Sequence, residues 1–414
     1  MRKGRKISYK EGYRGQLIKA VLENGFIPRD YIKLYDKPAA IQMQRAVRKM
    51  IQEDILKESK TISGSRYLRL TKTGEDLILS EANAELASQY KSPETKIKLR
   101  CLNIKKQPKS NQENEIAYKL AQNKLINDVS AKLFAEICGI ENKSKEKSIC
   151  PDSNRAMYYD STSIKRLGSY EASFTTDKHS QSKKLNNSRI NGLTISRGGI
   201  YSIYSTGNIM PEWKRKGEER MISSIKALVV KNINDMHVTD YESEAVIISK
   251  VDSTYTRIVK EENTRGINKR MLMSVDYAYE HMYSVPYTVD GIKMFTMMQK
   301  AGWQAKIKSQ MLSHNEMTES MYVSVPCDGY DKKEGIYKLV YCIPDMVKLK
   351  GFAKRAAIEE DRERYHIYCY KSQLPIIAPV IQGNAKVFVI SIDDMIRELE
   401  SSEKDSLSFA REVV

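Results

Sequence analysis

The first 80 residues change their apolar pattern in an order that few folds accommodate. Three segments with the spacing of helices come first, two segments with the period of strands follow, and one more helix closes the series. We expect the helices at 13–24, 28–35, 36–53 and 72–80, and the strands at 55–58 and 67–70. Helix, helix, helix, hairpin, helix predicts a small helical domain that carries a two-stranded projection.

Residues that favour turns and helix ends stand at the borders of these segments. Asn24-Gly25 suits a C-cap, Pro28 suits the first turn of the next helix, and Asp36 suits an N-cap. Ser63-Gly64-Ser65 indicates the hairpin turn, and Thr71 is placed to cap the last helix. The segments and their borders together are those of a winged helix-turn-helix domain.

The stretch from Tyr67 to Gly74 reads Tyr-Leu-Arg-Leu-Thr-Lys-Thr-Gly. It resembles the Y-x-x-L-T-x-x-G stretch that closes the wing in many bacterial winged-helix regulators. We expect Tyr67 and Leu70 to pack under the helices, Thr71 to cap, and Gly74 to allow a close approach. With the helices before it, this stretch is also similar to the N-terminal domain of replication-relaxation proteins, which plasmids and conjugative elements encode. The resemblance covers about a fifth of the chain and implies DNA binding in replication or transfer of such a mobile genetic element.

Positive charge is concentrated at the beginning of the chain. The formal net charge is +17; residues 1–110 contain 25 Lys or Arg and 12 Asp or Glu, whereas residues 111–414 contain 44 and 40. A basic domain joined to a nearly neutral one is the electrostatic pattern of a protein that binds the phosphate backbone of nucleic acid. A solvated basic surface and affinity for anionic lipid are the alternatives from charge alone.

A winged helix places its third helix in the major groove and its hairpin along the backbone or minor groove. Arginine pairs with guanine and glutamine with adenine, whereas hairpin lysines and arginines typically contact phosphates. The candidates for DNA binding are Gln42, Gln44, Arg45, Arg48 and Lys49 on the helix, and Lys60, Arg66 and Arg69 on the hairpin. The alternative is an ordinary solvated surface.

Strands and helices alternate from about residue 155 onward. In two places an apolar strand runs into an aspartate suited to capping the next helix, at Asp345 and Asp393. We therefore expect a mixed α/β fold, with a largely buried sheet in the second part. The expected strands lie at 157–159, 201–204, 246–248, 339–343, 365–370 and 387–390, with helices at 112–137 and 213–232.

These patterns divide the chain into six segments. The expected order is a basic tail at 1–12, the winged-helix domain at 13–88, a basic linker at 89–115, a connecting helix and loop at 116–154, an α/β domain of unassigned role at 155–400, and a C-terminal tail at 401–414.

The second part departs from the patterns of two kinds of DNA-cleaving enzyme. A relaxase of the HUH kind needs paired histidines on one strand, and the five histidines lie far apart with no H-x-H. A PD-(D/E)xK nuclease needs two carboxylates to hold Mg²⁺, and a lysine. Asp160 and Lys165 suit that pattern, but Ser163 stands where the second carboxylate is needed. Glu171 is not followed by x-Lys, so only a distant acid such as Glu218 keeps a Mg²⁺-dependent nuclease open as an alternative.

No other motif assigns chemistry to the second part. The chain contains no P-loop, no G-x-G-x-x-G and no G-x-S-x-G, and its six cysteines show no zinc-ligand spacing. We predict no catalytic residue, no metal and no cofactor. Arg189, with Trp213 and Glu218-Glu219 beyond it, indicates either a ligand site or an Arg–Glu pair that orients a strand and a helix.

The sequence thus predicts a sequence-specific protein that binds double-stranded DNA, and not an enzyme. No run of 18 apolar residues occurs and no apolar stretch follows the basic start, so we expect a cytoplasmic location without membrane contact. A second copy of the chain, or replication and transfer proteins, are the other expected partners. The remaining alternative is a transcriptional regulator whose α/β domain senses a ligand or forms a dimer.

Overall fold

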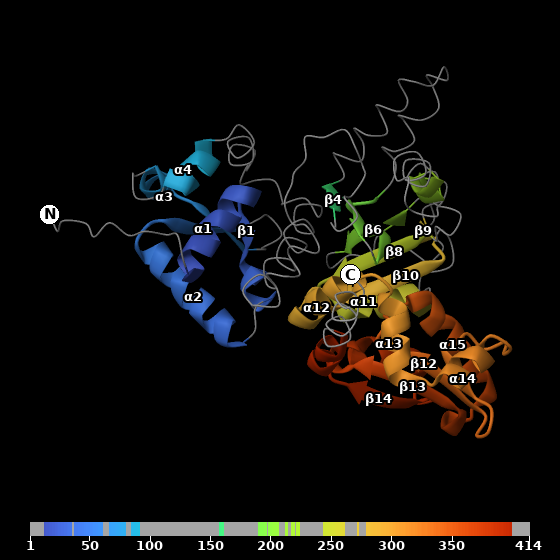
Figure 1. The fold of residues 1–414 in the computed structure, drawn as a ribbon. Helices are drawn as coiled ribbons and strands as arrows, with labels where there is room; N and C mark the ends of the chain where they lie inside the picture. The colour runs from blue at the N-terminus through green and yellow to red at the C-terminus, as the bar shows by residue number, and fades with distance from the viewer. Residues whose placement is uncertain are drawn as a thin grey trace, which may run out of the picture. The chain divides into compact units, whose positions relative to one another are not determined.

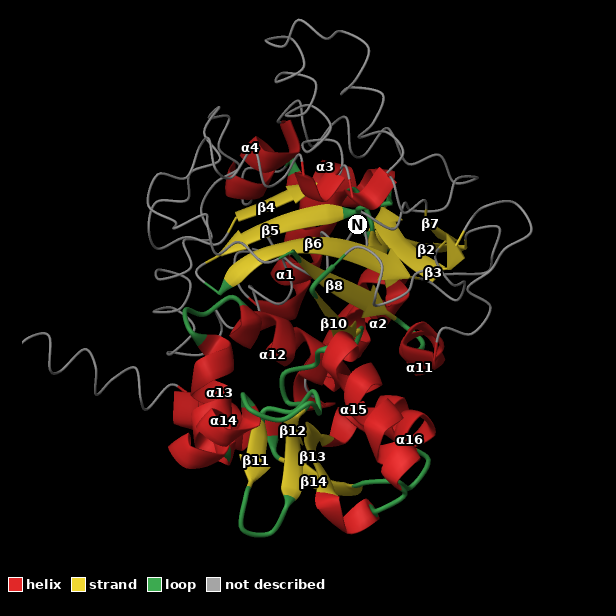
Figure 2. Cartoon of the chain, turned by 90° about the vertical axis from the view of Figure 1, so that its right-hand side faces the viewer, coloured by secondary structure: helices red, strands yellow, loops and turns green. Residues whose placement is uncertain are grey.

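A computed structural model describes parts of the chain in two compact units, residues 1–120 and 121–414 (Figure 1). Helices and sheets occur in both, which confirms the predicted mixed α/β class (Figure 2). The described residues are 12–34, 37–60, 66–79, 84–91, 157–160, 189–196, 198–206, 212–213, 217–219, 221–223, 243–260, 271–272 and 279–399. None of the helices in these ranges has the length and apolar character that crossing a bilayer requires.

The first unit alternates helices with three short strands. Its elements are α1 (Gly12–Asn24), β1 (Ile27–Pro28), the 3₁₀ helix η1 (Arg29–Leu34), α2 (Lys37–Gln52), β2 (Leu56–Lys60), β3 (Arg66–Leu70), α3 (Lys72–Ile78) and α4 (Ala84–Lys91). The strands form an antiparallel sheet in the order β1-β3-β2.

The helices of the first unit are held by apolar side chains at helical spacing. Those of α1 and α2 are fully buried: Leu17, Ile18, Val21 and Leu22 in α1, and Met43, Val47 and Met50 in α2. Phe26 packs edge-on against Tyr67 of β3, with ring centroids 5.9 Å apart. Each such side chain stabilises the unit by about 1.5–3 kcal/mol when it leaves water, so this core decides the local fold.

Three details of the first unit differ from the sequence-based expectation. The expected second helix is a 3₁₀ helix, because Pro28 pairs with Tyr67 in the sheet and the helix begins only at Arg29. A two-residue strand such as β1 is too short to leave a period-two pattern. A helix, α4, continues into residues expected to begin the linker. Asp36 and the turn at 63–65 lie outside the described residues.

The second unit contains a five-stranded sheet. Its strands are β4 (Met157–Asp160), β5 (Gly192–Ser196), β6 (Gly199–Thr206), β8 (Glu244–Ser249) and β10 (His281–Pro286), and their order is β10-β8-β6-β5-β4. The strands β6, β8 and β10 run parallel, and the other two pairings are antiparallel. Every residue of β8 is buried, as the expected apolar run at 246–248 predicts. Helices α11 (Asp252–Lys260) and α12 (Val289–Met298) follow β8 and β10.

A second, four-stranded sheet follows in the same unit. Its strands are β11 (Gly329–Asp331), β12 (Ile336–Val340), β13 (Tyr365–Tyr370) and β14 (Lys386–Ile390), in that order, with β12, β13 and β14 parallel. Figure 2 shows helices on both sides of it. Helices α13 (Trp303–Met311) and α14 (His314–Ser320) lie on one side, and α15 (Met346–Glu359) and α16 (Leu374–Ile381) on the other.

The two sheets share one apolar core, although the sequence led us to expect a single sheet. Ile247 of β8, Tyr255 of α11, Phe352 of α15 and Ile367 of β13 belong to one cluster of buried side chains. The backbone N–H of Ser284 in β10 also donates to the Pro344 carbonyl across 2.9 Å, which ties β10 to the segment that precedes α15.

The sequence predicts that aspartates cap two helices of the second unit, at Asp345 and Asp393. Asp345 does cap α15, because its carboxylate accepts from the Val347 N–H at 2.9 Å. The prediction for Asp393 is wrong: the helix at 392–399 follows Ser391, whose Oγ accepts from the Asp394 N–H, and Asp393 is bonded to Lys293. A serine two residues earlier supplies the capping oxygen instead.

The remaining expected helices are described only in part. Glu212–Trp213 form strand β7, which pairs with β9 (Met271–Leu272), so the helix expected at 213–232 does not begin at Trp213. Residues 217–219 and 221–223 are helical, and the rest of that prediction and the helix at 112–137 lie outside the described residues.

Candidate nucleic-acid interface

Helix α2 is divided into a buried apolar face and an exposed basic one. Met43, Val47 and Met50 are wholly buried. The predicted base-contact residues are all exposed: Gln42, Gln44, Arg45, Arg48 and Lys49. The sixteen residues of α2 include four Lys or Arg and no Asp or Glu. The exposed face therefore presents positive charge and amide groups to solvent without an acidic residue of its own.

A network around the end of α2 connects this helix to the hairpin. Asp54 adopts a left-handed conformation (φ 53°), and the Ile55 N–H donates to the Met50 carbonyl at 2.8 Å. The Thr71 hydroxyl donates to the carbonyls of Asp54 and Ile55, and also accepts from the Gly74 N–H at 3.0 Å. The hairpin is thereby fixed against the C-terminal end of α2.

The predicted roles in the stretch from Tyr67 to Gly74 are confirmed. Tyr67 and Leu70 are buried, Thr71 caps α3, and Gly74 lies directly against Ile55. A Cβ atom added to Gly74 would stand 2.3 Å from the Ile55 carbonyl oxygen. Only glycine avoids that overlap, which explains why a glycine occupies this position of the stretch.

Gly74→Ala should destabilise the first unit by roughly 1–3 kcal/mol, because the backbone of Ile55 must move to admit the methyl group. Helix propensity alone predicts the opposite sign, since alanine favours a helix by about 1 kcal/mol over glycine. Hydrogen exchange of the α1 and α2 amides in the full chain measures this stability. Lys72→Ala, at an exposed position of the same helix, is the control and should change it little. Equal protection in Gly74→Ala and the parent would contradict the packing argument.

The hairpin places its three candidate residues differently. Lys60 and Arg66 are register partners at the ends of β2 and β3 that residues 61–65 connect, and both are exposed. Arg66 also contacts Glu58 at 3.4 Å, and Arg29 contacts the same carboxylate at 3.2 Å. Arg69 lies on the opposite face of β3 from Arg66 and is half-buried, with an Nε atom that has no hydrogen-bond partner. Lys60 and Arg66 are therefore the pair best placed for phosphate contacts.

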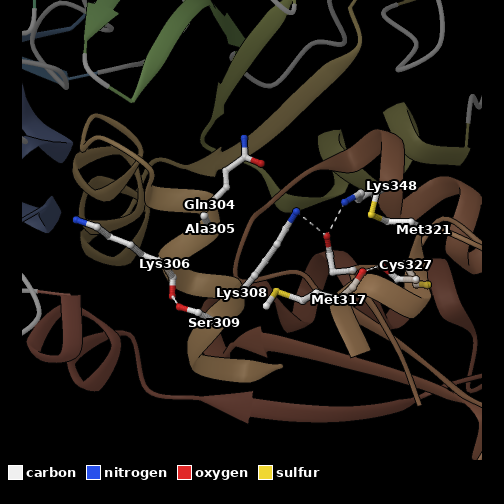
Figure 3. Close-up of a pocket in the computed structure, with 11 residues that line it drawn as sticks. Gln304, Ala305, Lys306, Lys308, Ser309, Met317, Met321, Cys327 and Lys348 are labelled. Atoms are coloured by element: carbon white, nitrogen blue, oxygen red, sulfur yellow. Dashed lines mark hydrogen bonds and ion pairs between the residues drawn. The ribbon is translucent and has the colours of Figure 1, made fainter. Parts of the chain in front are cut away.

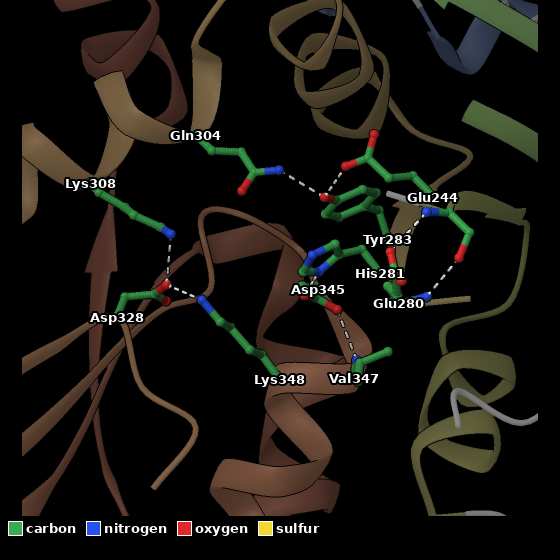
Figure 4. A network of polar contacts seen from close by, with 11 residues as sticks. Glu244, Glu280, His281, Tyr283, Gln304, Lys308, Asp328, Asp345, Val347 and Lys348 are labelled. Carbon is green, nitrogen blue, oxygen red and sulfur yellow. Dashed lines mark hydrogen bonds and ion pairs between the residues drawn. The ribbon is translucent and has the colours of Figure 1, made fainter. Parts of the chain in front are cut away.

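The second unit holds a buried carboxylate between two lysines. Lys308 of α13, at 3.2 Å, and Lys348 of α15 both form ion pairs with one carboxylate oxygen of Asp328 (Figure 3 and Figure 4). The second oxygen of this carboxylate accepts from the Val340 N–H at 3.0 Å. Burial alone would raise the pKa of Asp328, but Lys348 and Lys308 hold it below its usual value. For Lys348, burial alone would lower the pKa, but the charge of Asp328 raises it above its usual value. The Asp328 carboxylate and the Lys348 ammonium group thus stay charged across the neutral range.

A second set of polar contacts lies beside this cluster (Figure 4). His281 Nδ1 is 2.8 Å from the carboxylate of Asp345, the residue that caps α15. The Tyr283 hydroxyl donates to Glu244 at 2.7 Å and accepts from Gln304 at 2.8 Å. These bonds join β10 to β8, to α13 and to the N-terminal end of α15, and they leave Asp345 and Tyr283 satisfied although both are buried.

The residues of the nuclease pattern are not brought together among the described residues. Asp160 ends the edge strand β4, whereas Ser163, Lys165 and Glu171 lie outside the described residues. Glu218, the distant acid, is buried and accepts from the Tyr204 hydroxyl at 2.6 Å and from the Arg189 backbone N–H at 2.7 Å. Within the described ranges, no three His, Cys, Asp or Glu side chains gather closely enough to hold a metal ion.

No family model, no curated protein and no solved structure matches the chain. Its function is therefore argued from the geometry of the two units.

The sequence signalled the first of these sites and not the second. The basic face of α2 lies on one continuous segment, so its spacing is visible in the chain. Asp328, Lys308 and Lys348 come from three separate elements, and only their fold brings them together. Asp345 alone gave a signal, as a capping residue after a strand.

Proposed function

We propose that the first unit is a winged-helix domain that binds double-stranded DNA in a sequence-specific manner. The order helix, strand, 3₁₀ helix, helix, strand, strand and the sheet order β1-β3-β2 support this assignment. The observation that carries the proposal is the exposed face of α2, which has basic and amide side chains and no acidic residue.

In this proposal α2 enters the major groove. Arg45 and Arg48 reach guanine edges, and Gln42 or Gln44 reaches an adenine. Lys49 is placed for a backbone contact at the edge of the groove. The hairpin acts as the wing: Lys60 and Arg66 at its tip contact phosphates and set the register without reading sequence.

The biological setting that we propose is replication or transfer of a plasmid or conjugative element. The resemblance of residues 13–80 to replication-relaxation proteins supports this setting. It depends mainly on the Tyr67–Gly74 stretch, in which Thr71 caps α3 and Gly74 lies against Ile55. A footprint on the origin of the chain's own element would support this setting. A palindromic footprint at promoters, with half-sites one helical turn apart, would favour the dimeric regulator instead.

A fragment of residues 1–91 should fold alone and bind duplex DNA with a steep salt dependence. It contains the core around Leu17, Met43 and Tyr67 and the basic surface of α2. The logarithm of the binding constant should fall against that of salt concentration with a slope of about −0.9 per neutralised phosphate. Circular dichroism and fluorescence anisotropy with a labelled duplex measure both parts. A helical fragment with a slope near zero would argue against backbone contacts.

A further inference from the structure

The lysine cluster of the second unit borders a large open hollow. The hollow has a volume of about 860 Å³ and lies between α13, α14 and α15. This volume falls within the range of roughly 300–1,000 Å³ that is typical of ligand sites. Gln304, Lys308, Met317, Asp328 and Lys348 are among its lining residues (Figure 3).

The charge of this lining is positive. Lys308 and Lys348 both contact the carboxylate of Asp328, and Lys306 also lines the hollow. Asp328 neutralises one ammonium group and at the same time fixes two, because Lys308 and Lys348 both bond to it. Two ammonium groups held in one place, with net positive charge, suit an anion such as a phosphate, since little side-chain freedom is left to lose on binding.

A smaller hollow shares Lys348 with the first one. This second hollow, of about 370 Å³, is lined by Lys348, Lys350 and Lys354 along α15, and by Glu280, His281 and Asp345. Lys348 therefore borders both hollows. Adjoining basic hollows suit a chain of phosphates better than a single one, because successive phosphates can occupy them in turn.

Two large side chains that directly follow α14 are exposed to solvent. Met321 lines the first hollow and is 81% exposed, and Tyr322, the next residue, is 80% exposed. Lysines beside an exposed aromatic ring are the combination by which proteins hold single-stranded nucleic acid, through phosphate contacts and base stacking. Cys327 also lines the hollow, but burial raises the pKa of its thiol to about 11, so it offers no thiolate near neutral pH.

We propose that this lysine-lined surface of α13, α14 and α15 binds single-stranded nucleic acid, with Lys308 and Lys348 at phosphates and Tyr322 stacked on a base. The choice of nucleic acid over another phosphate carrier rests on the function proposed for the first unit. The two binding sites are nevertheless distinct, and each is tested by its own ligand.

The experiment measures binding of labelled oligothymidine to the full chain by anisotropy. Arg45→Ala and Arg48→Ala are present throughout, so that the first unit contributes little. In that background, Lys308→Gln and Tyr322→Ala should each weaken binding by about tenfold or more. Lys308→Gln leaves Asp328 paired with Lys348, so the fold is retained. Lys333→Glu, at an exposed turn outside the hollow, is the control and should stay within about twofold.

Cross-linking supplies a readout that does not depend on affinity. Oligothymidine carrying 5-iodouracil should cross-link to Tyr322 on irradiation, and peptide mapping identifies the site. Unchanged oligothymidine binding in both Lys308→Gln and Tyr322→Ala would overturn the proposal. The proposal would also be overturned if Lys308→Gln abolished binding to phosphatidylserine vesicles but left oligothymidine binding unchanged. If the parent chain did not bind duplex DNA, only the function proposed for the first unit would be refuted. The oligothymidine measurements would still test the second unit, because they do not depend on duplex binding.

Discussion

Replacing Arg45 and Arg48 together by alanine should weaken binding to the preferred duplex by at least about 30-fold. Both side chains are exposed on α2, and each bidentate contact to guanine discriminates by about 1–3 kcal/mol. Binding to random duplex should fall much less, because only the electrostatic part of the interaction is lost there. Selection from a random duplex library gives the preferred site, and anisotropy at one salt concentration compares the two ligands.

Two control variants separate base contacts from backbone contacts. Arg66→Ala, at the tip of the hairpin, should weaken binding to preferred and random duplex alike. Lys19→Ala, at an exposed position of α1, should change neither by more than about twofold. If the double variant lost the same factor on both ligands, α2 would contact the backbone and would not read bases.

Asp328→Asn should destabilise the second unit by about 3 kcal/mol at neutral pH. The substitution keeps the shape of the side chain but removes the charge that compensates Lys308 and Lys348. Breaking a buried ion pair from one side leaves the other charge without compensation, which is the costly direction. Both tryptophans, 213 and 303, belong to the second unit, so urea unfolding followed by tryptophan fluorescence reports on this unit alone.

The pH dependence of this effect has a definite sign. The pKa of Asp328 is lower in the folded unit than in the unfolded chain, so its contribution is present above the ordinary aspartate pKa of about 3.9. That contribution is lost as pH falls through the folded-state pKa. The pKa of Lys348 is raised, so its contribution is lost as pH rises above its own folded-state value. The difference in the free energy of unfolding between the parent and Asp328→Asn should therefore be largest between the ordinary aspartate pKa and the folded-state pKa of Lys348. It should become small in acid.

A surface aspartate provides the matched comparison. Asp394 pairs with Arg397 in solvent, and exposed pairs of this kind contribute at most about 1 kcal/mol. Asp394→Asn should accordingly leave the urea midpoint nearly unchanged. If Asp328→Asn unfolded at the same urea concentration as the parent, the two lysines would have to be solvated well enough to need no partner.

Local patterns in the sequence predicted the elements that one segment builds by itself. The period of the apolar residues in α1 and α2, the capping oxygen of Thr71 and the strand Tyr365–Tyr370 all depend on neighbours in the chain. The strand β1 was missed because two residues carry no period. Asp393 was misassigned because Ser391 offers a competing cap two residues earlier.

Features that depend on distant residues gave no such signal. Nothing in the residues of the strands near 247 and 367 shows that these strands belong to different sheets. The exposed basic face of α2 was predictable because helical spacing fixes which residues share a face. The grouping of Lys308, Asp328 and Lys348 was not, because it depends on how α13 and α15 pack.

The attachment of β10 to both sheets has a consequence for how the second unit comes apart. Its residues are hydrogen-bonded to β8 along one side, while Ser284 bonds to the Pro344 carbonyl and to the Tyr341 hydroxyl, 2.9 Å away in each case. Neither sheet can open along this line without exposing the apolar core of the other. We therefore expect the two sheets to lose their structure together, so that a substitution beneath either sheet destabilises both.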